Sequence, residues 1–274
     1  MPDLNLLNFE LRQPTKLLMP FIQAIWLVRN TNLEQETVFP VLSDGRMGLV
    51  CNFGEPFYSE SKGVKHVAAY GCTLSGPSRH LSQMVFKGHL DLVGVRFQPG
   101  AAFHFIQRPI CDMVDKAILA TPSLFPQFHE LFEILAPIKG KELIIRAIES
   151  FFLDLIERGD IQPDFVLRHL LTQIHMHPDW DLKTLLDSQN ISSRDLQRLF
   201  KKYIGIPPGV YIRLKKTGHA KHKIAGGKFV SLTGLSQDEG YYDQAHFIRD
   251  FKTFMEKTPS SYYKLKKAKK GDGA

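Results

Sequence analysis

Two stretches near the C-terminus of the chain repeat one helical pattern at a constant spacing. Residues 196–201 read LQRLFK and residues 247–252 read FIRDFK, so the offset is 249 minus 198, or 51 positions. The same offset pairs a proline and a tyrosine downstream of each copy: Pro208 with Pro259, and Tyr211 with Tyr262. Self-similarity of this kind predicts two copies of one supersecondary unit, which restricts the C-terminal part to a helical fold.

Each repeated helix is expected to have one apolar face and one outward face. Ser192 and Asp243 stand at the two N-cap positions and are residue types that favour a cap. The apolar residues recur at helical spacing in both copies: Leu196, Leu199, Phe200 and Tyr203, then Phe247, Phe251 and Phe254. The outward residues lie between them: Arg194, Gln197, Arg198 and Lys201, then Ala245, Ile248, Arg249 and Lys252. One face therefore serves a core and the other is free for a partner.

The outward face of the first copy has the chemistry needed to read DNA. A short helix, a tight turn and a second helix with an outward polar face form the geometry that enters a major groove. Arginine can donate two hydrogen bonds to guanine, and glutamine can pair bidentately with adenine. On a single helix such a face is more often ordinary solvated surface. The repeat, the capped turns and the local charge together favour the DNA-binding interpretation.

Positive charge is concentrated in the same part of the chain. Residues 1–180 hold 16 Lys and Arg against 19 Asp and Glu, a balance of −3. Residues 181–274 hold 19 against 9, a balance of +10, which exceeds the net charge of +7 of the whole chain. This is the electrostatic footprint of a protein that binds a polyanion, although the basic tail at 264–270 could by itself be a solvated end.

The N-terminal part has a different pattern and is expected to form a β-rich domain. Short apolar and β-branched runs are separated by turn signals, with strands expected over 22–28, 38–42, 48–53, 64–69 and 90–97. This spacing is typical of a sandwich or barrel. A helical pattern begins near Ala101, and the amphipathic helix 141–157 could serve the core alone or also a dimer interface.

The composition excludes several classes of protein. No apolar run approaches the length of about 20 residues needed to cross a bilayer, and the N-terminus lacks the pattern of a secretory signal. The three cysteines, Cys51, Cys72 and Cys111, are widely spaced and form no C-x-x-C pair. They are interpreted as reduced thiols of a cytoplasmic protein, with neither a disulfide framework nor a zinc site.

The C-terminal residues resemble those of the AraC-type transcription regulators. The similarity covers residues 181–265, about a third of the chain, and its core is GYYDQAHFIRDFK over 240–252 followed by Thr258-Pro259. The resemblance implies two helix-turn-helix subdomains joined by a long helix over 208–224, with two reading helices in adjacent major grooves. The run GVRFQPG over 94–100 is weakly similar to the β-rich sensory domains of some of these regulators. It implies a domain that senses a signal or mediates dimerisation.

The resemblance also assigns site residues position by position. Base reading falls on outward residues of both reading helices: Arg194, Gln197, Arg198, Gln244, Ala245, Ile248 and Arg249. DNA backbone contacts are expected from Ser193, Lys201, Lys202 and Lys252. The predicted fold is α+β, with a β-rich barrel or sandwich-like domain over 1–110 and a helical connector over 111–178 with a candidate dimerisation role. An all-α DNA-binding domain with two helix-turn-helix subdomains follows over 179–267.

Several residues depart from the family pattern in the supporting helices. A larger or polar residue replaces a small or apolar one at four positions: Leu186, Gln189, Ser236 and Glu239. Gly218 and Gly234 lie inside predicted helices, where glycine costs about 1 kcal/mol relative to alanine. The supporting helix of the second motif, 231–239, is therefore expected to be mobile or distorted.

The two reading helices are not equivalent in chemistry. The first carries Arg194, Gln197 and Arg198, whereas the matching positions of the second carry Ala245, Ile248 and Arg249. Alanine and isoleucine cannot hydrogen-bond to a base edge but can pack on a thymine methyl group. We therefore expect the first motif to supply most base discrimination and the second to position the protein on phosphates.

Other functions are disfavoured by the motifs that the chain lacks. It has no H-x-H with later Glu and His, no G-x-S-x-G and no phosphate-binding glycine loop, and no cysteine has an activating pattern around it. His219 and His222 lack further ligands, so they are expected to add charge near DNA and not to bind a metal. Arg96 is expected to form an ion pair at a strand end, with an anionic effector as the alternative. An architectural DNA-binding protein without an effector and a DNA-repair enzyme remain as alternative functions.

The expected partners follow from this interpretation. They are double-stranded DNA, a small-molecule effector, RNA polymerase and a second copy of the chain, with no membrane partner, cofactor or metal.

Overall fold

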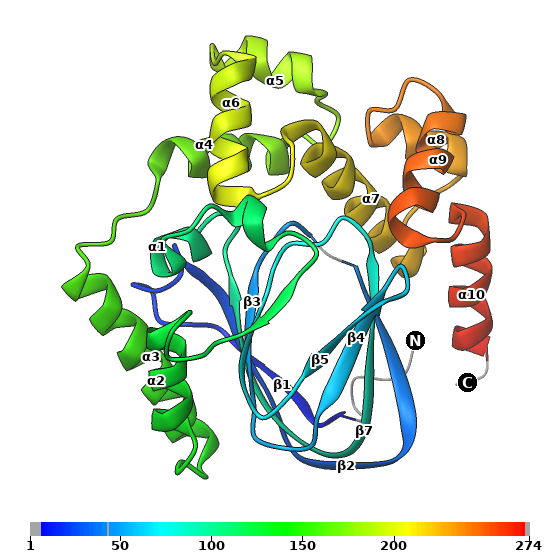
Figure 1. Ribbon diagram of the computed structural model, residues 1–274. Helices are drawn as coiled ribbons and strands as arrows, with labels where there is room; N and C mark the ends of the chain where they lie inside the picture. The colour runs from blue at the N-terminus through cyan, green and yellow to red at the C-terminus, as the bar shows by residue number, and fades with distance from the viewer. Residues whose placement is uncertain (1–6, 43, 272–274) are drawn as a thin grey trace.

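The computed structural model describes residues 7–42 and 44–271, and it has a β-rich part followed by a helical part (Figure 1). The strands are β1 Phe9–Arg12, β2 Ile22–Leu42, β3 Gly48–Asn52, β4 Phe57–Ser61, β5 Val64–Ala68, β6 Gly71–Ser75, β7 Leu81–Phe97 and β8 Ala117–Leu119. The first helices are α1 Ala102–Ile106, η2 Ile110–Met113, α2 Pro126–Leu135, α3 Lys141–Arg158 and α4 Phe165–Met176. The C-terminal helices are α5 Leu182–Gln189, α6 Ser193–Leu199, η3 Phe200–Ile204, α7 Pro208–Gly226, α8 Leu232–Asp238, α9 Gln244–Met255 and α10 Pro259–Gly271. The α+β fold class is confirmed.

Two long antiparallel strands, β2 and β7, organise the sheet. The strand order is β1-β2-β7-β3-β6-β8, and β4 pairs with both β5 and β7. The strands expected over 22–28 and 38–42 are two parts of the single strand β2, whose register against β7 shifts between Val28 and Thr31 and again between Leu33 and Thr37. Such irregularities bend a strand, so one long β2 can follow a curved sheet.

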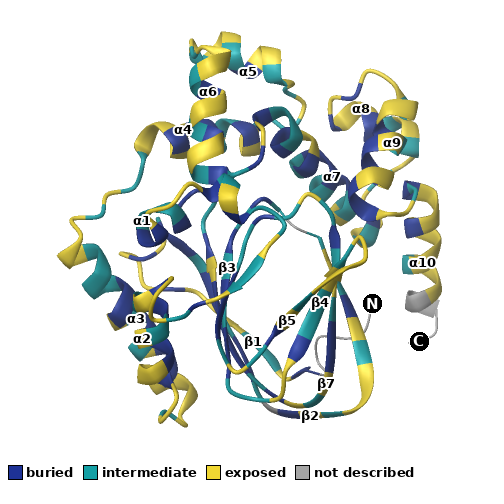
Figure 2. Ribbon diagram, viewed as in Figure 1, coloured by how far each residue is buried: buried dark blue, intermediate teal, exposed yellow. Residues whose placement is uncertain are grey.

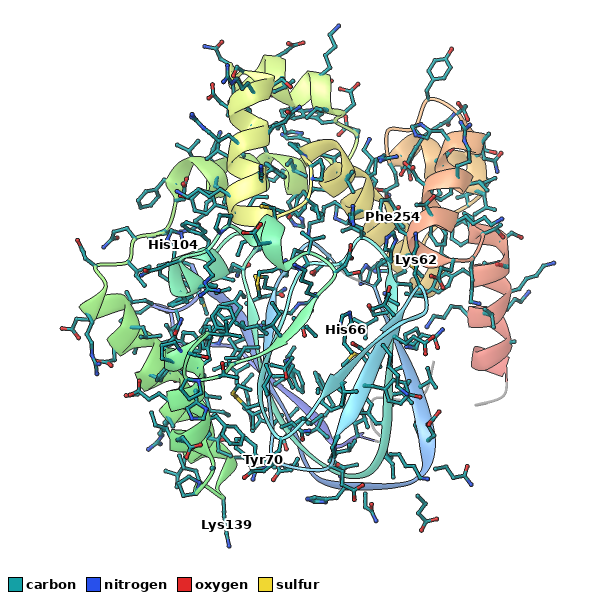
Figure 3. All side chains as sticks on the ribbon, in the orientation of Figure 1. Lys62, His66, Tyr70, His104, Lys139 and Phe254 are labelled. Atoms are coloured by element: carbon teal, nitrogen blue, oxygen red, sulfur yellow. A yellow bond between two sulfur atoms is a disulfide. The ribbon has the colours of Figure 1, made fainter. Side chains whose placement is uncertain are left out.

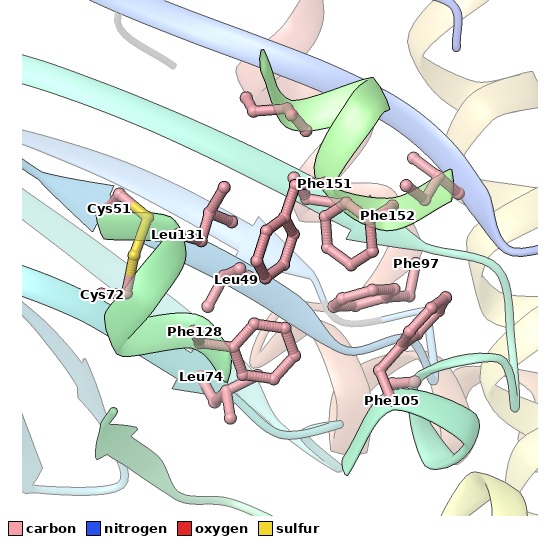
Figure 4. Packing of buried hydrophobic residues seen from close by; sticks show 14 of the residues in the cluster. Leu49, Cys51, Cys72, Leu74, Phe97, Phe105, Phe128, Leu131, Phe151 and Phe152 are labelled. Carbon is pink, nitrogen blue, oxygen red and sulfur yellow. A yellow bond between two sulfur atoms is a disulfide. The ribbon is translucent and has the colours of Figure 1, made fainter. Parts of the chain in front are cut away.

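The sheet is covered on one flank by α2 and α3 (Figure 1). The apolar face of α3 is buried in the main hydrophobic core, where Phe152 is fully buried and its ring lies 5.1 Å from Phe105 and 5.8 Å from Phe97 (Figure 4). The apolar face of the 141–157 amphipathic helix therefore packs within the chain, which both interpretations of this helix require. Leu143, on another side of α3, is exposed.

The structure corrects the cysteine prediction. Cys51 on β3 and Cys72 on β6 are directly opposite one another in register, both are buried, and a disulfide joins them. Figure 4 shows this bridge beside Leu131 of α2. Cysteines 21 positions apart carry no pairing signal in sequence, because their proximity depends on the strand register. Cys111 is free, as expected.

The helical connector expected over 111–178 is divided by its packing. Helices α2 and α3 bury their apolar residues against the sheet. Helix α4 instead contributes Leu167, Leu170 and Ile174 to the hydrophobic cluster that contains α5, α6 and η3. Figure 2 shows buried residues on α4 and α6, and both helices contribute to this cluster. No helix of the described residues is long and apolar enough to cross a membrane.

Candidate nucleic-acid interface

The first helix-turn-helix motif consists of α5, the turn at 190–192, and a reading helix made of α6 and η3 (Figure 1). The Ser192 side chain accepts a hydrogen bond from the Asp195 backbone N–H at 3.1 Å, and the Ser192 hydroxyl donates to the Asp195 carboxylate at 2.6 Å. The predicted N-cap is therefore confirmed. Of the predicted inner face, Leu196 and Phe200 are 0% exposed, and Leu199 and Tyr203 are half-buried against the same hydrophobic cluster. The predicted face therefore points inward, with its outer edge partly open.

The outward face of the first reading helix is open to solvent. Arg194, Gln197, Arg198, Ser193 and Lys201 are all exposed. The Arg198 guanidinium lies 3.0 Å from the Asp195 carboxylate, an exposed i,i+3 pair that costs little to break. Within the described part of the chain, Arg194 and Lys201 have no ion-pair partner. The side-chain hydrogen-bond donors that could contact bases or phosphates are thus unpaired or held only by weak surface interactions.

Lys202 is exposed but is placed differently from the other basic residues. Its ammonium group lies 4.7 Å from the ring centroids of both Phe103 and Tyr203, and Phe103 belongs to α1 of the N-terminal region. A cation over an aromatic face is held by the ring quadrupole. The structure therefore places Lys202 at the contact between the β-rich part and the first motif.

The second motif consists of α8, the turn at 239–243, and the reading helix α9. Ser231 caps α8 and Asp243 caps α9, accepting from the Gly234 and His246 backbone N–H groups at 3.0 and 2.7 Å. Ala245, Arg249 and Lys252 are exposed, and Arg249 has no ion-pair partner within the described ranges. The Asp243 cap, which the repeat pairs with Ser192, and the buried residues Phe247, Phe251 and Phe254 agree with the repeat.

Two predicted base-reading residues of the second motif are less available. Ile248 is half-buried and packs against the core of this motif. The side-chain oxygen of Gln244, also half-buried, accepts a hydrogen bond from the Thr233 hydroxyl at 3.2 Å. The second reading helix thus offers fewer free groups than the first.

The supporting helix α8 is formed over Leu232–Asp238 without the expected distortion. Its expected mobility stays a prediction. Glu239 is fully buried and lies 2.9 Å from the Lys223 ammonium and 3.7 Å from the His219 ring on α7. Burial raises the pKa of the Glu239 carboxyl, while Lys223 acts against this rise. The polar residue at an apolar position is therefore accommodated by a charged partner on the linker helix.

His219 lies in an environment that acts against the positive charge expected of it. It lies between Glu239 and His175, whose ring centroid is 5.7 Å away, and burial lowers its pKa. His222 is exposed, and its ring contacts the Gly218 carbonyl at 2.7 Å. No group of three or more potential metal ligands occurs among the described residues.

The β-rich part contacts the first motif at the end of its reading helix. The Phe103 and Tyr203 rings lie 4.7 Å apart, and the His104 ring, labelled in Figure 3, lies 5.8 Å from Tyr203. Gly205 ends η3 with a φ of 86°, and a Cβ there would lie 2.8 Å from the Ile110 carbonyl oxygen. Close backbone approach and a positive φ both require glycine at this contact.

A second contact joins the β2–β3 loop to α7. Asp44 pairs with Arg46 and Arg96, and a Cβ on Gly45 would lie 2.6 Å from the Tyr211 ring. Burial, with a further contribution from Arg46, lowers the pKa of Lys215 on α7 to about 8. The expected ion pair of Arg96 is confirmed, and it lies at the junction of the two parts.

Sequence reasoning missed Phe103 and Ile110 at these contacts and one buried charge. At the repeat offset, Asp250 stands where the first motif has Leu199, and it is only 4% exposed. A carboxylate at a position where the other copy of the repeat has leucine could therefore have identified Asp250 from the sequence. Phe103 and Tyr203 carry no comparable signal, because their meeting depends on how distant segments pack.

Comparisons with known proteins agree with the helix-turn-helix geometry. Residues 185–264 match a helix-turn-helix domain family, and residues 10–119 match a family described as a domain of unknown function. An uncharacterized HTH-type transcriptional regulator of Haemophilus influenzae is 24% identical over 139 residues, 46% of each chain. The HTH-type transcriptional regulator MtrA of Neisseria gonorrhoeae is 25% identical over 147 residues, 47% of this chain and 48% of its own. The chain thus spans about half the length of these relatives.

Among solved structures, the chain is similar to ToxT of Vibrio cholerae. The match covers 93% of this chain and 97% of ToxT, with a TM-score of 0.46 and 10% sequence identity.

Proposed function

We propose that this chain is a sequence-specific DNA-binding transcription regulator whose C-terminal helix-turn-helix domain is of the AraC type. The observation that carries this proposal is the pair of capped motifs on one linker helix, each with an exposed basic outer face. The balance of +10 over 181–274 supports a polyanionic partner. We place its action in the cytoplasm, where bacterial DNA is accessible.

Selection of binding sites from random DNA tests this proposal. We expect one enriched sequence, read in two adjacent major grooves, and an affinity that falls steeply with salt because counterions are released. An architectural protein would instead bind with similar affinity to all sequences in the pool. Absence of binding at low salt would contradict DNA binding altogether.

The outward residues of the first reading helix are more exposed than those of the second, which supports unequal roles of the two helices in base reading. We propose that Arg194, Gln197 and Arg198 read most of the bases. Gln244, Ala245, Ile248 and Arg249 would add fewer base contacts, since Ile248 and Gln244 are half-buried. Ser193, Lys201 and Lys252 would bind phosphates.

Arg198→Ala and Lys201→Ala are expected to weaken DNA binding in different ways. Loss of Arg198 should cost about 1–3 kcal/mol on the selected site and relax specificity at one base pair. Loss of Lys201 should weaken binding to all sequences alike and reduce the salt slope by about 1. Titrations of both variants against the selected site and single-base variants, at several salt concentrations, measure this. Uniform weakening by Arg198→Ala would contradict its assignment to base reading.

Control by the N-terminal domain is the second part of the proposal. The contacts of Phe103 and Ile110 with the end of the first reading helix connect the two parts physically. A signal that moved the β-rich part would change the environment of Lys202 and Tyr203. We propose a small-molecule effector as this signal.

Phe103→Ala should release Lys202 for phosphate binding. We expect the salt slope of DNA binding to become steeper by about 0.9, the value for one further neutralised phosphate. Phe53→Ala is the matched control, because Phe53 is likewise partly buried on the main core but packs on Phe132 and Tyr70. A slope equal to that of the wild type in Phe103→Ala would show that the ring does not restrain Lys202.

The packing also suggests a domain division. We propose that α2 and α3 belong with the β-rich domain and that the DNA-binding domain begins at α4, because α4 shares its core with the first motif. We further propose that the chain forms a homodimer and contacts RNA polymerase.

A further inference from the structure

The two helix-turn-helix motifs touch each other directly as well as through the linker helix. Gly240 lies in the turn of the second motif with a φ of 68°. A Cβ at Gly240 would lie 2.2 Å from the carbonyl oxygen and 2.5 Å from the Cα of Asp179, which precedes α5 of the first motif. The backbones therefore meet at a distance that only glycine permits.

A buried lysine on the linker helix joins the same two backbone segments. Lys216 of α7 is 5% exposed, and its ammonium group donates hydrogen bonds to the carbonyl oxygens of Asp179 and Gly240, each at 3.3 Å. The ammonium also lies 5.4 Å from the ring centroid of Tyr241. Burying a charge is costly unless it is paired or hydrogen-bonded, so the two carbonyl groups stabilise Lys216 where it is.

A second polar contact ties α7 to the second reading helix. Arg213, one turn before Lys216, lies 3.2 Å from the carboxylate of the buried Asp250 on α9. The first motif has Leu199 at the equivalent position. The side of α7 that carries Lys216 and Arg213 is therefore attached to both the turn and the reading helix of the second motif.

These contacts have a consequence for DNA spacing. Reading helices that enter adjacent major grooves must lie about 34 Å apart along the duplex. A linker helix alone leaves the second motif free to pivot at the helix end, whereas contacts from Lys216 to both motifs oppose a pivot. We propose that Lys216 is a positioning residue that sets the angle between the two reading helices and thereby the spacing of the DNA elements the protein accepts. The effect on DNA spacing rests on the proposed function, whereas the effect on the angle between the reading helices does not.

A distance measurement in the full chain without DNA tests the positioning role. Spin labels on Lys201→Cys and Lys252→Cys, in a Cys111→Ser background, mark equivalent points of the two reading helices. We expect one narrow distance distribution in the otherwise unchanged chain. Lys216→Met and Gly240→Ala should broaden it or shift it by several ångström, because the first removes the donor and the second forces the backbones apart.

Two further variants make the measurement specific. Gly218→Ala is the control on the same helix, since a Cβ there meets no atom within 4 Å, and its distribution should stay narrow. Lys216→Arg keeps a cationic donor and should restore part of the narrow distribution. Distributions that stay equally narrow in Lys216→Met and Gly240→Ala would overturn the proposal, provided thermal melting shows both variants folded.

A spacing series gives the DNA readout. In the site obtained by selection, one base pair is added or removed between the two elements. The wild type should lose affinity by about tenfold for such a change, in the range of one mismatched base pair, and Lys216→Met should lose much of this preference. Equal weakening at all spacings would assign Lys216 a merely structural role and overturn the proposal. A chain that binds no DNA would refute the proposed function, while the distance measurement would still decide the positioning role.

Discussion

Truncation of Phe200 or Phe251 to alanine should destabilise the motif that contains it by about 3–5 kcal/mol, the usual cost of removing a buried phenylalanine. The two residues are equivalent in the repeat, and both are 0% exposed. The ring of Phe200 packs 5.5 Å from Tyr211, and that of Phe251 lies 5.8 Å from Phe247 and 5.9 Å from Tyr262. Thermal or urea unfolding measures the loss, with Phe165→Ala as a control because Phe165 is 71% exposed.

The same pair of variants separates the roles of the two motifs on DNA. If the first motif supplies most base discrimination, Phe200→Ala should remove the preference for the selected sequence and leave weak, salt-dependent binding. Phe251→Ala should weaken binding to every sequence but keep the base preferences of the first motif. Binding titrations with the selected site and a scrambled site compare them. If both variants lost the same amount of base discrimination, the proposal that the first motif reads most of the bases would be wrong.

Reduction of the Cys51–Cys72 disulfide should lower the stability of the β-rich domain by about 3 kcal/mol, as expected for a closed loop of this length. The cysteines are separated by 21 positions and connect the adjacent strands β3 and β6. Both side chains are buried in the main core, next to residues from the sheet and α2. Opening the bridge increases the conformational freedom of the unfolded chain, which disfavours folding.

Thermal unfolding with and without dithiothreitol measures this effect, and the double variant Cys51→Ala, Cys72→Ala should behave like the reduced protein. Cys111→Ser is the control, because Cys111 is free and its loss should leave the melting temperature nearly unchanged. A melting temperature insensitive to reductant, with all three thiols titrating under reduction, would contradict a stabilising role of the bridge.

Predictions from neighbouring residues held where local interactions decide the structure. Ser192 and Asp243 cap their helices as expected, because an N-cap depends on a side chain and a backbone N–H a few positions away. The inner faces of the reading helices follow from helical periodicity, and the linker helix over 208–224 extends to Gly226. The single long strand β2 was missed, because turn-like residues between two apolar runs do not reveal that pairing continues across a bulge.

The repeated motifs, the N-caps of the reading helices, their basic outer faces and the α+β order of the chain could be predicted from the amino-acid sequence. The contacts between distant groups could not: the disulfide of Cys51 and Cys72, the position of Lys202 against Phe103, and the bridge from Lys216 to both motifs. The difference lies in the range of the interactions. Caps and helical faces depend on residues within about one turn, whereas strand register and helix packing depend on segments brought together only when the whole chain folds.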